Sequence, residues 1–395
     1  MLRRTAVKAL GTLRGGTQQS SLGAGIFEAD GFACGAESRR NYGHQALALQ
    51  NNTLRKGPGG RSSVSGVVAT VFGATGFLGR YVVNALAKMG SQVVVPYRCD
   101  DMDMQHIRQM GDLGQIICLP DFDVRDESKI KHAISQSSVV INLMGAQLET
   151  WNFSYNDIHV EAARRVAQIA KASPLVERFI HVSALGADTS ASSERLKSKL
   201  EGEKQVLEVI PESTVFRPGY IVGIEDRFYN VIASLGKSLP YIPLIDGGAT
   251  RVQPVYVRDV ADALLESLKS KDTCGKTYNL AGPDILTMAQ AVDLVFDEMR
   301  EKRTTMYFPA PLAKMFVLPH TLLHKKLPLH FFSHMLTADF INELSKDNVL
   351  PADVLTFADL GMEPRSVVQG LPVDHVRFWR AGGYDFGATA GTQEA

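Results

Sequence analysis

Cysteine and long apolar runs are both scarce in this chain of 395 residues, and each scarcity removes a class of protein. The four cysteines form no CxxC pair, which excludes a disulfide-stapled fold and indicates reduced thiols. No uninterrupted apolar run approaches the ~20 residues that a membrane-spanning helix needs. We expect no metal site, because His320, His324, His330 and His334 have no carboxylate or cysteine at ligand spacing.

Net charge is also absent, but the charges are divided unevenly along the chain. Residues 1–64 hold nine Lys and Arg against three Asp and Glu, so this segment is basic and the remainder is acidic. An acidic body has no broad positive surface for a phosphate backbone, which argues against nucleic acid as a partner. The 45% hydrophobic content is that of an ordinary globular protein with a sizeable core.

The N-terminal segment has the features of an organellar address. Its first 27 residues contain four basic side chains and no acidic one, and apolar residues recur at helical spacing between Leu2 and Leu13. We therefore expect residues 1–64 to be a mitochondrial presequence followed by a flexible segment. A merely disordered tail is the alternative.

From residue 66 onward, short β-branched runs alternate with helical stretches. Alternating strands and helices predict a parallel sheet with helices on both faces, so the fold class is α/β, a Rossmann-type doubly wound sheet with a smaller C-terminal α/β region. We expect a dinucleotide-binding domain over residues 65–235, a smaller region over 236–382 and a flexible tail over 383–395. The predicted strands cover residues 66–72, 91–97, 114–120, 137–143, 177–183 and 213–218.

A glycine-rich loop follows the first of these strands and opens a helix. Glycines at this place allow a tight turn and a close approach of the backbone to a pyrophosphate, which also meets the positive end of the helix. We therefore predict dinucleotide binding at this loop. Its candidate residues are Gly73, Thr75, Gly76, Phe77, Leu78 and Gly79.

The end of the second strand predicts which dinucleotide is bound. An NAD site would place Asp or Glu here, whereas this chain has Arg98, and Arg80 follows the glycine loop. Arginine suits a phosphate, so we expect the 2′-phosphate of NADP(H). The alternative is a solvated Arg98 that pairs with Asp100 or Asp101.

Further candidates lie at the ends of later strands, where ligands of such sheets gather. Asp123 is placed to accept from the adenine amino group, and Asn142 and Gly145 end the fourth strand beside the expected cleft. Pro218 belongs to a Pro-Gly turn that lets the backbone approach the nicotinamide end. A plain turn explains the last two features almost as well.

Several motifs carry a family resemblance, among them GATGFLGRYVV, VVINLMGA, RFIHVSAL and FRPGYIVGIEDRF. They resemble atypical members of the extended short-chain dehydrogenase/reductase superfamily, and in particular the nucleotide-binding accessory subunits of mitochondrial respiratory complex I. The resemblance is dense over residues 66–235 and thinner to residue 382. It implies a tightly held NADPH, a peripheral place on the matrix side of the inner membrane, and complex I subunits near the junction of the matrix and membrane arms as partners.

The catalytic position of this superfamily is altered in the sequence. Reductases of the family use a serine, a tyrosine and a lysine, and the matching positions hold Ser183, Arg195 and Lys199. A guanidinium does not exchange protons at neutral pH, so ordinary ketoreduction is disfavoured and Lys199 is expected to hold the nicotinamide ribose. In the simpler interpretation Lys199 is a solvated helix residue and Ser183 caps the strand end.

The sequence thus favours a non-catalytic NADPH-binding accessory subunit that is needed for assembly or stability of complex I. The alternative is an NADP-dependent reductase or epimerase of the same superfamily. An apolar, proline-broken stretch with basic residues at 306–336 is expected to contact inner-membrane lipid or a partner subunit, unless it is ordinary core.

Overall fold

The computed structural model describes residues 64–188, 191–317, 337–370, 373 and 375–380, which belong to one compact unit. The expected presequence, the C-terminal tail, and most of the 306–336 stretch with its four histidines lie outside the described residues. The structure therefore does not describe the presequence, the tail or the four histidines. Of the 306–336 stretch it describes residues 306–317, where Ala310 and Ala313 are buried and Met315 and Phe316 are exposed.

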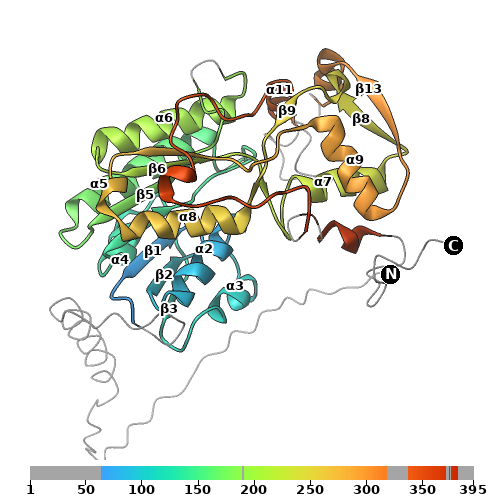
Figure 1. Ribbon diagram of the computed structural model, residues 1–395. Helices are drawn as coiled ribbons and strands as arrows, with labels where there is room; N and C mark the ends of the chain where they lie inside the picture. The colour runs from blue at the N-terminus through green and yellow to red at the C-terminus, as the bar shows by residue number, and fades with distance from the viewer. Residues whose placement is uncertain (1–63, 189–190, 318–336, 371–372, 374, 381–395) are drawn as a thin grey trace, which may run out of the picture. The chain divides into compact units, whose positions relative to one another are not determined.

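A single parallel sheet of seven strands organises the described chain (Figure 1). Its order is β11-β6-β5-β4-β1-β2-β3, and the six strands predicted from sequence are all present, each end within two residues of the expected bound. The order reverses between β1 and β4, which is the doubly wound arrangement that the alternation predicts. The strands are β1 (Val68–Phe72), β2 (Gln92–Pro96), β3 (Ile116–Leu119), β4 (Val139–Asn142), β5 (Arg178–Val182), β6 (Thr214–Pro218) and β11 (Thr277–Leu280).

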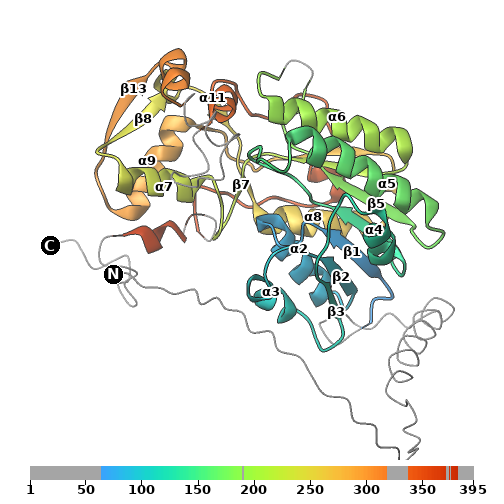
Figure 2. The ribbon, with the colours of Figure 1, turned by 180° about the vertical axis from the view of Figure 1, so that it is seen from behind.

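Helices cover both faces of this sheet because successive strand residues point to opposite sides. In β4, Ile141 packs with the core under α2, α3 and α8, whereas Val140 packs with the core under α4, α5 and α6. Figure 2 shows the second group from behind. These helices are α2 (Phe77–Lys88), α3 (Asp101–Arg108), α4 (Glu127–Ile134), α5 (Ala162–Ala172), α6 (Glu194–Val209) and α8 (Val257–Lys269).

A smaller region with its own core follows β6. Its helix α9 begins with a capping box in which Thr287 and Gln290 bind each other's backbone, and α9 packs on α7. The remaining elements are β7 (Ile221–Val222), α7 (Tyr229–Ser238), β8 (Tyr241–Ile245), β9 (Arg251–Val252), β10 (Val255–Tyr256), β12 (Leu286–Thr287), α9 (Met288–Met299), β13 (Thr304–Phe308) and α11 (Ala338–Leu344). Short turns of 3-10 helix lie at 246–248, 271–273, 358–360 and 375–379.

The chain crosses between the two regions more than once. β11 and α8 come after residue 235, yet β11 pairs with β6 at the edge of the main sheet and α8 packs on α2. The later residues therefore complete the main sheet and its helices as well as building the smaller region. The division of the chain near residue 235 remains a prediction.

Candidate functional site

The glycine loop lies at the carboxyl ends of β1 and β4, where the strand order reverses. Gly73 has a φ of +79°, and a Cβ there would lie 3.0 Å from the Leu143 backbone. A Cβ on Gly79 would lie 2.5 Å from the carbonyl oxygen of Gly73, so neither position accepts a side chain without a shift. Gly76, by contrast, is exposed with a φ of −71°. The loop thus forms a tight turn that leaves its outer side open.

Helix α2 presents its first N–H groups to the same opening. Its N-cap is Gly76, which has no side chain to accept from them, and no acidic residue occupies the first turn. Uncapped N–H groups and the positive end of the helix dipole favour an anion at this point. The loop and the helix together make a cradle of the kind that holds a pyrophosphate.

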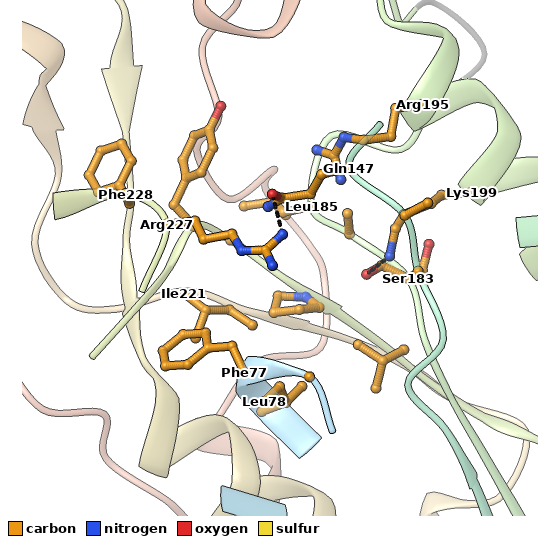
Figure 3. A pocket seen from close by; sticks show the side chains of 18 of the residues that line it. Phe77, Leu78, Gln147, Ser183, Leu185, Arg195, Lys199, Ile221, Arg227 and Phe228 are labelled. Atoms are coloured by element: carbon orange, nitrogen blue, oxygen red, sulfur yellow. Dashed lines mark hydrogen bonds between the residues drawn. The ribbon is translucent and has the colours of Figure 1, made fainter. Parts of the chain in front are cut away.

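A cavity of about 340 Å³ opens beside the loop (Figure 3). Its walls bring together residues that are far apart in sequence, from the glycine loop, the ends of β4, β5 and β6, and helices α6 and α11. Among the sequence-predicted residues, it is lined by Gly73, Gly76, Phe77, Leu78, Gly79, Gly145, Ser183, Arg195, Lys199 and Pro218. The structure does not place Thr75, Arg80, Arg98, Asp123 or Asn142 in this lining.

Two of these residues, Asn142 and Thr75, lie near the glycine loop but outside the cavity lining. Asn142 is buried, its Nδ2 donates to Nδ1 of His181 at 3.2 Å, and its Oδ1 accepts from the Met144 N–H at 3.1 Å. Both ends of its amide are thus engaged by protein groups. Thr75 lies half-buried in the glycine turn.

Of the other three residues, Arg98 and Asp123 follow the second and third strands, and Arg80 belongs to α2. Arg98 is exposed, and its guanidinium carbon lies 5.2 Å from the centroid of the Phe153 ring. Asp123 is exposed, and its Oδ1 accepts from the Arg125 N–H at 2.9 Å. Arg80 Nη1 lies 3.7 Å from a carboxylate oxygen of Glu225. None of the described ion pairs joins Arg98 to Asp100 or Asp101, and Asp101 pairs with Arg108.

Lys199 and Ser183 face each other at the inner end of the cavity (Figure 3). Nζ of Lys199 donates to the backbone oxygen of Ser183 at 3.1 Å, and a Cβ on Gly145 would lie 3.5 Å from this Nζ. Burial, reinforced by the nearby Arg195 charge, lowers the pKa of Lys199 to about 7. The lysine is therefore directed into the site instead of into solvent.

Arg195 stands one helical turn before Lys199 and is bound to helix α11. Its Nε and Nη2 donate to the two carboxylate oxygens of Glu343 at 2.8 and 2.7 Å. Burial alone would lower the pKa of Arg195, but the Glu343 carboxylate keeps it raised. Asp339, also in α11, accepts from the backbone N–H groups of Glu194 and Arg195. The side chain in the expected tyrosine position is thus a fixed cation.

Several residues of the site carry no signal in the sequence. His159 lies in a turn of π-helix at 156–161, where its Nε2 accepts from the Ala146 N–H at 2.9 Å and its Nδ1 lies 2.7 Å from Oγ of Ser198. Burial, together with the Lys199 charge, lowers the pKa of His159 to about 2, so the ring is neutral and its proton is on Nδ1. A π-turn has no compositional mark, so this placement was not predictable.

Tyr220 is a tyrosine that lines the cavity. Its ring stacks on Phe228 with centroids 5.0 Å apart. Burial and the Glu343 carboxylate raise the pKa of Tyr220, which makes its hydroxyl a poorer proton donor than a free tyrosine. Tyr220 is therefore no substitute for the family tyrosine.

The site fits a dinucleotide on two observations. The glycine cradle is open at Gly76, and Oγ of Ser183, in the cavity lining, is buried without a partner among the described residues. Buried polar groups normally find a partner, so a bound polar molecule explains the Ser183 hydroxyl. Nε of Arg80 is also buried without a partner among these residues, but Arg80 lies outside the lining. A nicotinamide dinucleotide would supply hydride chemistry here. The chain itself supplies the cradle, the Lys199 amine and the fixed Arg195 cation.

Comparison with known proteins agrees with this geometry. The model of the NAD dependent epimerase/dehydratase family matches residues 69–281, so the chain belongs to this family of extended short-chain dehydrogenases. Solved structures show the same fold at 19% identity: an NADPH-dependent quinone oxidoreductase of Escherichia coli, complexed with NADPH, has a TM-score of 0.58 and covers 76% of this chain and 97% of its own.

Within the family, the chain groups with a particular set of mitochondrial proteins. It is 44% identical to NADH dehydrogenase (ubiquinone) 1 alpha subcomplex subunit 9 of Arabidopsis thaliana, over 90% of this chain and 88% of that one. The Mus musculus protein of the same name is also 44% identical, over 84% and 83%. The 40 kDa subunit of NADH-ubiquinone oxidoreductase of Neurospora crassa is 35% identical over 87% and 89%.

Proposed function

We propose that the protein is an accessory subunit of mitochondrial NADH:ubiquinone oxidoreductase, complex I, that holds NADPH without turning it over. The observation that carries this proposal is the Arg195–Glu343 ion pair at the edge of a dinucleotide cavity. The cradle for the cofactor is complete, whereas the proton donor is replaced by a cation that another helix holds. The assignment to complex I rests on the names of the relatives, which are subunits of that complex.

The proposed binding mode assigns a role to each end of the cofactor. The pyrophosphate rests on Gly73–Gly79 and the N-terminus of α2, and Lys199 hydrogen-bonds the nicotinamide ribose. Arg98 binds the 2′-phosphate, and Asp123 accepts a hydrogen bond from the adenine amino group. Arg80 and Ser183 gain partners for their buried polar atoms. These assignments make the bound molecule a bridge between the glycine loop and helix α6.

A peripheral place on the matrix side of the inner membrane follows from the same proposal. Within the part of the chain that the structure describes, no helix combines the length and apolarity that a membrane span requires. In this proposal the protein is held in the complex by neighbouring subunits near the junction of the matrix and membrane arms. The smaller region, on the ancestral substrate side, is the surface we propose for those contacts.

Native-gel separation of mitochondrial membranes tests this function. The protein should co-migrate with complex I subunits identified by mass spectrometry. Denaturation of the isolated complex should release NADP(H) from this subunit. Migration as a free protein that carries no nucleotide would contradict the proposal.

A second function, an NADP-dependent reductase or epimerase, has one specific observation in its favour. Lys199 has a pKa of about 7 and lies beside the unpartnered Oγ of Ser183, so the site does contain a group that exchanges protons near neutral pH. This function requires the free protein to consume NADPH with a definable substrate, in a way that depends on Lys199.

A further inference from the structure

Phe153 is contacted by two arginines that follow different strands. Arg98 comes after β2 and Arg125 comes after β3, and their guanidinium carbons lie 5.2 and 4.2 Å from the centroid of the Phe153 ring. Both arginines are exposed, and the Phe153 ring that they share is half-buried. One aromatic ring therefore contacts two cations at the carboxyl edge of the sheet.

Neither cation is neutralised by an ion pair in the described part of the chain. Arg125 is held instead by hydrogen bonds, because its Nη2 donates to the backbone oxygen of Asn152 and its N–H donates to Asp123. Hydrogen bonds from Ser154 and, to a lesser degree, the Arg125 charge lower the pKa of Asp157. The Asp157 carboxylate is not in an ion pair with Arg125, and its Oδ2 accepts from the Ser154 N–H at 2.9 Å. Two like charges that contact one ring repel each other, and an anion that meets both would relieve this repulsion.

The place of the pair in the fold identifies the anion. β2 and β3 are neighbours in the sheet, and the residue after β2 is the one that meets the adenosine ribose in this fold. Asp123, two residues before Arg125, is the group that we propose at the adenine. A doubly charged phosphate on the ribose would then lie between the two guanidinium groups, whose planar forks suit its oxygens.

We propose that Arg125 determines specificity for NADP(H) together with Arg98, and that Phe153 is the positioning residue for both. The inference rests on the proposed function, since it needs the dinucleotide at Gly73–Gly79. The sequence points only to Arg98, because a residue six positions after β3 has no place in the dinucleotide fingerprint. The loop after β4 contributes Phe153 and makes Arg125 part of the site.

The test measures the affinity of the full chain for NADPH and for NADH by titration. Arg125→Gln should weaken NADPH binding about tenfold or more, because it removes a charged hydrogen-bond donor, and should change NADH binding less than twofold. Phe153→Leu should lower the preference for NADPH without abolishing NADH binding. Arg251→Gln is the matched control, since this exposed arginine pairs with Asp347 in the smaller region.

Each outcome of the titration decides the proposal. An Arg125→Gln variant with the wild-type ratio of NADPH to NADH affinity would overturn it, and so would an equal loss of both affinities. A wild type that binds both dinucleotides equally would overturn the proposal that Arg98 and Arg125 bind the 2′-phosphate, while leaving the proposed dinucleotide site intact. A wild type that binds neither would overturn the proposed function as well.

Discussion

Arg195 and Glu343 meet through two parallel hydrogen bonds although 148 residues separate them in the chain. The guanidinium belongs to α6, beside the cavity, and the carboxylate belongs to α11. Their side chains are 19% and 5% exposed, so the pair is largely removed from water. The free energy of burying the Arg195 charge is therefore offset by the Glu343 carboxylate.

Replacement of Glu343 by Gln should destabilise the protein by about 3 kcal/mol, because it leaves the Arg195 charge buried without a counter-charge. Chemical denaturation of the two proteins measures the difference in the free energy of unfolding. Lys269→Gln is the control, since Lys269 is 64% exposed and pairs with Glu266 on one surface helix. That variant should lose at most about 1 kcal/mol. A Glu343→Gln variant as stable as the control would show that the buried pair is dispensable.

His159 should make the protein sensitive to acid. Its pKa is about 2 in the folded state and about 6.5 in the unfolded chain, so below pH 6.5 the unfolded state binds a proton that the folded state does not. Stability is therefore lost as the pH falls from 6.5 toward 2. His159→Gln, whose amide oxygen can still accept from the Ala146 N–H, should reduce the slope of unfolding free energy against pH by about 1.4 kcal/mol per pH unit.

His132→Gln, at an exposed histidine of α4, provides the comparison for this measurement. His181, whose pKa burial lowers to about 3, contributes in the same direction and remains in both variants. An unchanged slope in His159→Gln would mean that the His159 ring takes up a proton without unfolding.

Gly76→Val should empty the dinucleotide site while leaving the turn in place. The backbone at residue 76 has a φ that valine adopts, and a Cβ there would meet only the Gly73 carbonyl oxygen, at 3.2 Å. The remaining methyl groups would occupy the cradle. If the cofactor braces the fold, the variant should lose the ligand stabilisation, about 3 to 4 kcal/mol at 100 to 1,000 times Kd.

The readouts for Gly76→Val are nucleotide content after denaturation, melting temperature and the level of assembled complex I. We expect all three to fall, whereas the electron-transfer centres of the complex should stay chemically intact. A variant without nucleotide that melts and assembles like the wild type would assign the cofactor a role other than bracing.

The isolated wild-type protein should not oxidise NADPH with aldehydes, ketones or quinones above background. Arg195 cannot donate a proton, and the raised pKa of Tyr220 makes it a weak replacement. Absorbance at the NADPH band measures the rate. Consumption that disappears in a Lys199→Met variant would establish the reductase instead.

The sequence predicted the parts of this molecule that depend on local pattern. Residues 93–95 are three consecutive valines, which is typical of a strand buried on both faces. The glycine loop is predicted by the spacing of its glycines directly after the first strand. The fold class and the strands up to β6 follow from such signals.

Long-range pairings could not be predicted in this way. β11 is only four residues long and follows β6 by about sixty residues, so nothing local shows that it joins the main sheet. Glu343 has no feature that distinguishes it from other acidic helix residues until α11 brings it to Arg195. Phe153 lies in a loop whose path depends on tertiary contacts, and Arg125 gains its proposed role only through that path.

The position of β11 also affects how the edge of the main sheet is protected during folding. The main sheet ends with Thr277–Leu280 paired along Val215–Pro218, so β6 has an uncovered edge until the chain through residue 280 has folded back onto it. Open strand edges recruit other chains, and pairings between distant segments form slowly. A partly folded chain in which β1 to β6 have formed without β11 is therefore prone to aggregate.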